Sequence, residues 1–304
     1  MTGLHIPEKS GYTGYVGVIG RPNVGKSSIV NRIIGKPISI VTKKKQTTRR
    51  TIHGILNLFD SQIIFLDNPG IDFNSKFLIN KYLNKQALSG LQGLDVILFV
   101  LEAREFTNDD KKILGVLPRN IPLFILFNKI DLIRDEVKRK EVYERVTFLK
   151  KYNPQAIIPV SAKRNYQLDI LIPLVKKHLK WDCFQFGTAT EIAHDKKFIS
   201  SEIIRKNIMD SVGDELHYGI AVEVDSINPL KSNRNMLFIR ATIHVSKTNH
   251  KPMIIGIGGK KLSFIRRQSM YELKNFFDKK VTLSLWVKVS LKWERNILKL
   301  GSIT

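Results

Sequence analysis

The most constraining feature of the chain is a glycine-rich segment between an apolar run and a helical pattern. Residues 20–27 read Gly-Arg-Pro-Asn-Val-Gly-Lys-Ser, after the apolar run Tyr15–Ile19 and before the helical pattern Ser28–Ile34. This is the G-x-x-x-x-G-K-S pattern in the strand–loop–helix context that marks a phosphate-binding loop. A chance glycine turn before a helix is the alternative, and the two flanking elements argue against it. The segment predicts a site for a nucleoside triphosphate.

Each residue type in this loop has a physical role in holding phosphates. Gly20 and Gly25 allow a tight backbone turn whose N–H groups, with the positive end of the next helix, face the anion. Lys26 is expected to reach the β- and γ-phosphates, and the Ser27 hydroxyl to ligate Mg²⁺. We expect nucleotide contacts along the whole loop, from Gly20, Arg21, Pro22, Asn23, Val24, Gly25, Lys26, Ser27 and Ser28.

A second phosphate motif, Asp67-Asn-Pro-Gly70, follows the strand-like run Gln62–Leu66. Asp67 is expected to hold Mg²⁺ through a water molecule. The N–H of Gly70 is expected to approach the γ-phosphate, because no side chain blocks it. The predicted nucleotide contacts in this segment are Asp67, Asn68, Pro69, Gly70 and Ile71.

Two further motifs select the base. In Asn128-Lys-Ile-Asp131, the carboxylate of Asp131 would accept hydrogen bonds from the two adjacent N–H donors on the edge of guanine, whereas adenine presents the wrong pattern. Asn128 is expected to tie this loop to the phosphate loop, and the stem of Lys129 to cover one face of the base. A helix-capping sequence is the alternative for this motif alone. Backbone groups that meet the guanine oxygen are expected at Ser161, Ala162 and Lys163. The order and spacing of the motifs predict a GTPase.

Hydrolysis is expected to need no nucleophile from the protein, because phosphoryl transfer to water is catalysed by positioning and charge neutralisation. Lys26, Thr48 and Gly70 are the expected catalytic residues, and Ser27, Thr48 and Asp67 the expected Mg²⁺ ligands. A threonine hydroxyl that ligates Mg²⁺ only while the γ-phosphate holds its loop closed is expected in Gln46–Arg49, where we favour Thr48 over Thr47. Small regulatory GTPases place a water-orienting Gln where this chain has Ile71, so intrinsic hydrolysis is expected to be slow.

Asn23 is a hypothetical ligand for K⁺. Together with carbonyl groups from a closed Lys43–Thr48 loop, its side chain would hold the cation where an arginine finger otherwise acts. Stabilisation of the loop's turn is the alternative role for Asn23.

The pattern of apolar runs predicts two domains. Short, fully apolar runs such as Asp95–Leu101 are typical of strands buried on both faces of a parallel sheet. They alternate with helical patterns, which predicts a doubly wound α/β domain over residues 12–181. Residues 182–196 lose periodicity and are expected to form a linker. Residues 197–304 predict a smaller α+β domain with the order helix, strand, strand, helix, strand.

The second domain carries a G-x-x-G segment, Gly256-Ile-Gly-Gly259, before a basic helix. In a KH module this loop lets an RNA backbone approach closely, whereas a simple helix N-terminal turn is the alternative. Residues 251–304 hold 12 basic and 3 acidic side chains, within a chain of 50 Lys+Arg and 27 Asp+Glu. This excess predicts a polyanionic partner. Residues 1–181 also carry more basic than acidic side chains, 30 against 15, and for that excess a lysine-rich bias with solvated helix faces is the alternative. The expected RNA-binding residues are Gly256, Ile257, Gly258, Gly259, Lys260, Lys261, Arg266 and Lys288.

Two tryptophans of this domain, Trp286 and Trp293, are candidate stacking platforms for bases. For Trp286 we favour core packing, because it lies in an apolar strand-like run.

These motifs together resemble the Era family of bacterial ribosome-assembly GTPases over nearly the whole chain. The matching segments are Gly20–Ser27, Gln46–Arg49, Asp67–Gly70, Asn128–Asp131, Ser161-Ala162, Ser201–Arg205, Gly256–Gly259 and Leu285–Val289. The resemblance implies a type II KH fold, binding of the 3′ end of 16S rRNA through that domain, and a role in maturation of the 30S subunit. For some members it implies peripheral association with the inner membrane.

The chain departs from the family pattern at four positions. Asn68 stands where Thr is usual, and His217 where Pro is usual. Ile257 and Gly258 stand where polar or basic residues are common, which shifts the expected side-chain contacts with RNA to Lys260 and Lys261.

Two other functions are compatible with parts of the sequence. One is a constitutive RNA chaperone in which GTP is mainly a stabilising ligand. The other is a P-loop kinase, against which Asn128–Asp131 argues. A single cysteine, Cys183, and the lack of a signal-peptide pattern in Met1–Gly14 predict a cytoplasmic location. We expect a monomer without an obligate protein partner.

Overall fold

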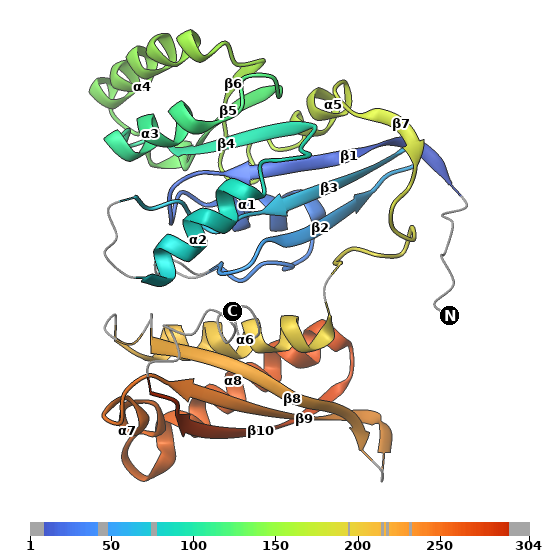
Figure 1. Cartoon of the computed structure of the whole chain (residues 1–304), viewed down its shortest axis with the longest axis vertical. Coiled ribbons are helices and arrows are strands. Elements are labelled where there is room, and N and C mark those ends of the chain that lie inside the picture. The colour runs from blue at the N-terminus through green and yellow to red at the C-terminus, as the bar shows by residue number, and fades with distance from the viewer. Residues whose placement is uncertain are drawn as a thin grey trace. The chain divides into compact units, whose positions relative to one another are not determined.

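The computed structural model describes residues 9–41, 48–73, 78–193, 195–213, 216, 219–230 and 233–291. The chain divides into two compact units near Ala193 (Figure 1). The first unit contains β1 (Ser10–Ile19), α1 (Lys26–Ile34), β2 (Ile52–Asn57), β3 (Ser61–Asp67), α2 (Leu78–Ser89), β4 (Val96–Glu102), α3 (Asn108–Val116), β5 (Leu123–Asn128), a 3₁₀ turn (Ile130–Leu132), α4 (Glu136–Leu149), a second 3₁₀ turn (Lys150–Tyr152), β6 (Ala156–Pro159), α5 (Leu171–Lys176) and β7 (Lys180–Cys183).

The strands of the first unit form one sheet in the order β2-β3-β1-β4-β5-β6, which Figure 1 shows side by side. β1 pairs in parallel with β3 and β4, and β5 pairs in parallel with β4 and β6. β2 is antiparallel to β3, and the two form a hairpin. The carboxyl ends of the parallel strands therefore lie at one edge of the sheet, and the loops that follow them meet there.

Both faces of this sheet are covered. Ile97, Phe99 and Leu101 alternate along β4 and join one hydrophobic cluster with residues of α2, α3 and α4. The residues between them are buried as well, which requires a second layer on the other face. There the ring of Phe124 contacts His178, just after α5. The doubly wound α/β arrangement that the apolar runs predict is therefore present.

The first part of the expected linker, residues 182–193, belongs to the first unit. β7 pairs antiparallel with the start of β1, and Phe184 after it is fully buried. Gln62 of β3 accepts hydrogen bonds from the backbone N–H groups of Gln185 and Phe186, at 2.8 and 3.0 Å. Residues 184–193 thus pack on the first unit, because a side-chain amide remote in sequence satisfies their backbone.

The second unit contains α6 (Lys196–Ser211), β8 (Ile220–Leu230), β9 (Asn233–Val245), α7 (His250–Ile255), a 3₁₀ turn (Ile257–Gly259), α8 (Lys260–Phe277) and β10 (Lys280–Val289). Its sheet has the order β10-β9-β8, with β9 antiparallel to β8 and parallel to β10. The expected order of helices and strands is confirmed, with the short α7 as an addition.

α6 and α8 pack on each other and on this sheet. α8 buries Ile265, Ser269 and Leu273, which recur every fourth residue and define its inner face. Within the described residues, none of the helices combines the length and the apolar character that crossing a membrane requires.

Candidate nucleotide-binding site and nucleic-acid interface

The loop between β1 and α1 has a backbone that only glycine tolerates at two points. Gly20 has a φ of 154° and Gly25 a φ of 97°. A Cβ atom at Gly20 would lie 2.4 Å from the carbonyl oxygen of Val100, and one at Gly25 would lie 2.2 Å from the Asn128 amide nitrogen. Larger residues would push the loop away from β4 and β5. The first turn of α1 has no acidic residue and no described side-chain cap, so its positive end favours an anion.

Lys26 is buried, and its ammonium is held by the loop itself. Its Nζ donates to the carbonyl oxygens of Gly20 and Arg21, at 3.1 and 2.9 Å. Burial lowers the pKa of Lys26 to about 8. The negative charge of Asp67 raises this pKa, and the positive charge of Arg21 lowers it by a smaller amount. The geometry keeps a cation at the centre of a loop that otherwise offers backbone groups.

The three expected metal ligands converge. The Ser27 hydroxyl donates to Asp67 Oδ2 at 2.6 Å and lies 3.1 Å from the Thr48 hydroxyl. Burial raises the pKa of Asp67, although the Ser27 hydrogen bond and the charge of Lys26 act in the opposite direction. The other carboxylate oxygen, Oδ1, is buried and accepts no hydrogen bond from any described residue. The cluster consists of hydroxyl and carboxylate oxygens, and Asp67 Oδ1 has no hydrogen-bond donor among the described residues. Such a set of oxygens fits a hard cation such as Mg²⁺.

Asn128 joins two of the predicted loops. Its Nδ2 donates to the carbonyl oxygen of Val24 in the phosphate loop at 2.8 Å. Its Oδ1 accepts from the N–H of Ala162 at 3.1 Å. The expected tie between Asn128 and the phosphate loop is therefore present, and a third loop is attached to the same side chain.

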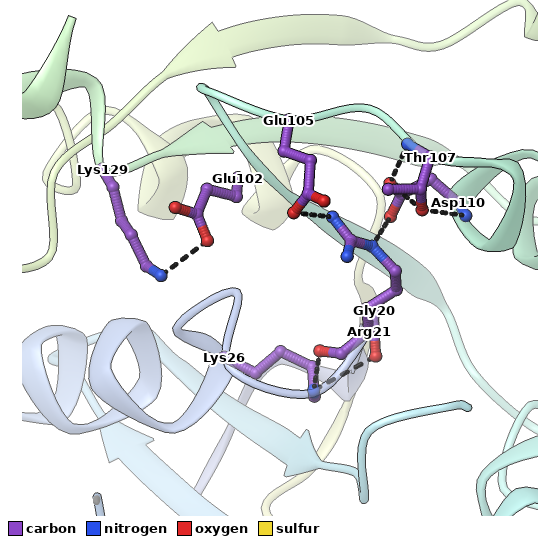
Figure 2. Close-up of polar contacts among 8 residues, drawn as sticks. All are labelled: Gly20, Arg21, Lys26, Glu102, Glu105, Thr107, Asp110 and Lys129. Carbon is purple, nitrogen blue, oxygen red and sulfur yellow. Dashed lines mark hydrogen bonds and ion pairs between the residues drawn. The ribbon is translucent and has the colours of Figure 1, made fainter. Parts of the chain in front are cut away.

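The other residues that are expected to select the base lie around this link. Asp131 accepts from the Ser161 hydroxyl at 2.5 Å, so its carboxylate is oriented by the neighbouring loop. Lys129 has a left-handed backbone, with φ 64°, and its ammonium pairs with Glu102 at the end of β4, at 2.7 Å. Lys163 is exposed. Figure 2 shows the Lys129 ammonium directed toward Glu102.

Arg21 fastens the phosphate loop to α3, as Figure 2 shows. Its Nε donates to Asp110 Oδ1 at 2.8 Å, and its Nη2 pairs with the exposed Glu105 at 3.2 Å. Asp110 is fully buried, and its Oδ2 accepts from the backbone N–H and the hydroxyl of Thr107, at 2.8 and 3.0 Å. We call these four residues the Arg21 clamp. Sequence reasoning missed Glu105, Thr107 and Asp110, although Thr107–Asp110 has the spacing of a helix-capping box.

The segment after β3 lies against the phosphate loop. A Cβ atom at Gly70 would lie 2.6 Å from the backbone nitrogen of Pro22, so this close approach requires glycine. The N–H of Ile71 donates to the carbonyl oxygen of Gly20 at 3.2 Å. The Ile71 side chain is fully buried in the cluster under α2 and α3. This side chain thus belongs to the core.

Asn68 and Asn23 differ in their surroundings. Asn68 is buried, accepts from the Thr51 hydroxyl at 2.9 Å and donates to the carbonyl oxygen of Leu66 at 3.2 Å. It therefore supports the turn where the family usually has Thr. Asn23 is exposed, with a left-handed φ of 65°.

Residues Lys43–Thr47, His217 and Trp293 lie outside the described residues.

The G-x-x-G segment of the second unit forms the turn between α7 and α8. Gly256, Gly258 and Gly259 all have positive φ, at 74°, 56° and 74°. The side chain of Ile257 between them is 91% exposed. Lys260 and Arg266 are exposed and Lys261 is half-buried. The segment thus presents a side-chain-poor backbone beside cations.

The expectation that Trp286 packs in the core is wrong, since its side chain is 68% exposed. Val281, Leu283 and Val287 are the buried positions of β10, so the alternation along the strand places Trp286 on the other face. The exposed Lys288 shares that face. The Lys251 ammonium of α7 lies 5.8 Å from the centre of the Trp286 ring.

Two family models match the chain. A model described as "50S ribosome-binding GTPase" matches residues 15–129, and a KH-domain model matches residues 215–294. The two matches fall on the two structural units.

Similar proteins extend over almost the whole chain. GTPase Era of Nitrosomonas eutropha is 38% identical over 97% of this chain and 98% of its own length. GTPase Era of Vibrio vulnificus is 35% identical over 96% of this chain and 92% of its own. Two solved structures each share 32% identity and cover 96% of this chain and 98% of their own. One is a tyrosine-to-alanine variant of Aquifex aeolicus Era bound to GDP and AlF₄⁻, with a TM-score of 0.90. The other is Era with MgGDPNP and nucleotides 1506–1542 of 16S ribosomal RNA, with a TM-score of 0.91.

Proposed function

Because the chain belongs to the Era family of GTPases, we propose that its GTP hydrolysis controls binding of the 3′ end of 16S rRNA during maturation of the 30S subunit. The observation that carries this proposal is the convergence of five segments of the chain at one sheet edge. Ser27, Thr48 and Asp67 gather there, and Asn128 links the phosphate loop to the loop of Ala162. A solved Era structure with a GTP analogue and 16S rRNA supports both ligands.

We assign the phosphates of GTP to the loop between β1 and α1. Lys26, which donates to the carbonyls of Gly20 and Arg21, would turn toward the β- and γ-phosphates. Ser27 and Thr48 would hold Mg²⁺, with Asp67 acting through water. The bound metal supplies charge neutralisation at the β- and γ-phosphate oxygens. The Gly70 N–H would approach the γ-phosphate.

The base would lie between Lys129 and the loop of Ser161. Asp131 would accept from the guanine N–H donors, and the Ser161 hydrogen bond already orients its carboxylate. Adenine lacks these two adjacent donors and would leave the Asp131 carboxylate unpaired, which is the source of discrimination against adenine.

Ile71 cannot orient the attacking water, because its side chain is apolar and buried in the core. We therefore propose slow hydrolysis that depends on an added charge near the phosphates. K⁺ at Asn23, on the exposed surface of the loop, is the proposed source. Single-turnover hydrolysis should be faster in KCl than in NaCl, and Asn23→Ala should remove this difference. Equal rates in the two salts would exclude the role for K⁺.

The RNA interface is proposed for the turn between α7 and α8, together with the outer face of β10. Positive-φ glycines permit close approach of an RNA backbone. Lys260, Lys261, Arg266 and Lys288 would neutralise phosphates. Trp286 offers an exposed ring for stacking, which is worth ~1–3 kcal/mol per base.

The test is RNA affinity in two nucleotide states. Fluorescence anisotropy of a labelled RNA with the sequence of nucleotides 1506–1542 of 16S rRNA would be measured with the full chain, in GDPNP and in GDP. A switch requires different dissociation constants in the two states. Equal constants would favour the alternative, an RNA chaperone for which GTP is only a stabilising ligand.

A further inference from the structure

The outer face of α8 carries basic and aromatic side chains in alternation. Lys260, Phe264, Arg267, Tyr271 and Lys274 follow one another at intervals of four, three, four and three residues. At 3.6 residues per turn, this spacing keeps all five within one narrow line along the helix. We call this line the α8 stripe. All five residues are exposed, with Phe264 at 46% and Tyr271 at 65%.

Packing does not account for the α8 stripe. The buried face of α8, with Ile265, Ser269 and Leu273, lies on the opposite side of the helix. A solvated helix face would explain exposed lysines and arginines. It gives no reason for two aromatic rings at successive positions of the same line, with a cation before, between and after them.

The charge of the α8 stripe is not compensated within the helix. Glu272 is the acidic residue of α8, and it lies off the stripe, where it pairs with Lys206 of α6 at 2.7 Å. The flanking exposed positions Ser263, Gln268 and Asn275 are neutral and polar. A continuous cationic surface with exposed rings complements a strand that offers phosphates and unstacked bases.

We propose that the α8 stripe is a second RNA-contact surface, which extends the interface from the G-x-x-G loop along the outer face of α8. The proposal rests on the RNA binding proposed above. Lys260 directly follows Gly259, so the stripe begins at that loop. It runs ~21 Å to Lys274, at 1.5 Å per residue. Arg267 and Lys274 contact phosphates, and Phe264 and Tyr271 stack on bases.

An anionic membrane surface is a poorer match for the same residues. A helix that lies on a membrane presents a broad apolar face to the lipid. The apolar face of α8 packs inside the second unit, and polar residues flank Phe264 and Tyr271. Two rings in a cationic line suit stacking with bases better than burial in acyl chains.

The experiment uses the full chain with the labelled RNA of nucleotides 1506–1542. Phe264→Ala and Tyr271→Ala should each weaken binding about fivefold or more, because each removes one stacking platform. The double variant Arg267→Gln/Lys274→Gln should lower the slope of log Kd against log salt by about 1.4, since each phosphate contact on a single strand contributes ~0.7. Phe264→Trp should retain wild-type affinity.

A matched control removes an exposed ring and a lysine elsewhere. Tyr143 of α4 is 73% exposed, and Tyr143→Ala/Lys140→Gln should leave RNA affinity unchanged. GTP hydrolysis without RNA should be unchanged in every α8 variant. Unaltered melting temperatures would confirm that losses of affinity are not losses of folding.

A further variant separates this proposal from the RNA binding on which it rests. Gly258→Asp adds a negative charge to the G-x-x-G loop at a position where a Cβ meets nothing within 4 Å. Its φ of 56° is strained for side chains, but Asp adopts it more readily than most residues. If the wild type binds RNA and Gly258→Asp does not, while the α8 variants bind like the wild type, the α8 stripe is not an RNA surface. If the wild type does not bind this RNA, the proposed function itself fails. Loss of binding to phosphatidylglycerol vesicles by the α8 variants, with RNA affinity intact, would assign the stripe to a membrane instead.

Discussion

The Arg21 clamp should be a major source of stability for the first unit, and Asp110→Asn tests this. The change keeps the shape of the side chain but removes its charge. The carboxylate of Asp110 receives a hydrogen bond from Arg21 Nε on one oxygen, and two from Thr107 on the other. An amide has only one acceptor oxygen. Its NH₂ group must therefore face a donor, either on Arg21 or on Thr107.

The magnitude follows from the burial of this pair. Asp110 is fully buried, and the Arg21 side chain is 16% exposed. Removal of one partner from a buried ion pair destabilises a protein by about 3–5 kcal/mol. Glu105 still pairs with Arg21 in the variant, so we expect the lower end, about 3 kcal/mol. Weaker GDP binding should accompany this loss, since the carbonyl of Arg21 helps to hold Lys26.

The assay is urea unfolding with a tryptophan that reports on the first unit. The chain has three tryptophans, and changing Trp286 and Trp293 to Phe leaves Trp181 of β7. The midpoint and slope of its transition give the free energy of unfolding for Asp110→Asn and for its parent. Asp109→Asn is the control, because its pairing with Lys112 at 3.7 Å is partly exposed and should contribute well under 1 kcal/mol.

A loss below about 1 kcal/mol for Asp110→Asn, or an equal loss for Asp109→Asn, would refute this reasoning. It would mean that solvent or Glu105 satisfies Arg21 as well as the buried carboxylate does.

Three other predictions concern the nucleotide site. Ile71→Gln should destabilise the chain by ~2 kcal/mol or more and should not accelerate GTP hydrolysis, because position 71 faces the core; a faster single-turnover rate would contradict this placement. Asp131→Asn should weaken GTP binding ~10³-fold or more, while binding of xanthosine triphosphate improves, since the amide offers the base a donor; competition binding measures both. The pKa of Lys26 is lowered to about 8 by burial, so the charge that we propose binds phosphates is lost as the pH rises. GDP affinity of the nucleotide-free protein should fall about tenfold from pH 7 to pH 9, and a flat profile would show that the ammonium stays charged.

The sequence predicted the elements whose chemistry is local. The phosphate loop requires Gly20 and Gly25 for backbone conformation, and their spacing is set by a short turn. Runs such as β4 are apolar on both faces because both faces are covered. The α8 helix shows its inner face as a regular repeat. These features depend on neighbours within a few residues and can be recognised without coordinates.

The features that sequence reasoning missed depend on residues that are far apart along the chain. Arg21 and Asp110 are separated by 89 positions, and Gln62 reaches the backbone of Gln185 over 123 positions. No local pattern indicates such pairs. Trp286 is different, because the polar residues Thr282, Ser284 and Lys288 alternate with apolar ones along β10. That alternation was a sufficient signal that Trp286 lies on the outer face.

The two hydrogen bonds of Asn128 connect the proposed base site to the proposed phosphate site, so the two sites are not separable modules. The same amide holds Val24 of the phosphate loop and Ala162 of the loop after β6, and Arg32 of α1 donates to the Ala162 carbonyl as well, at 3.2 Å. Guanosine and pyrophosphate, offered as separate fragments, should therefore each strengthen the binding of the other. An engineer who transplanted only the Asn128–Asp131 loop into another scaffold would obtain neither the specificity nor the affinity of the intact site.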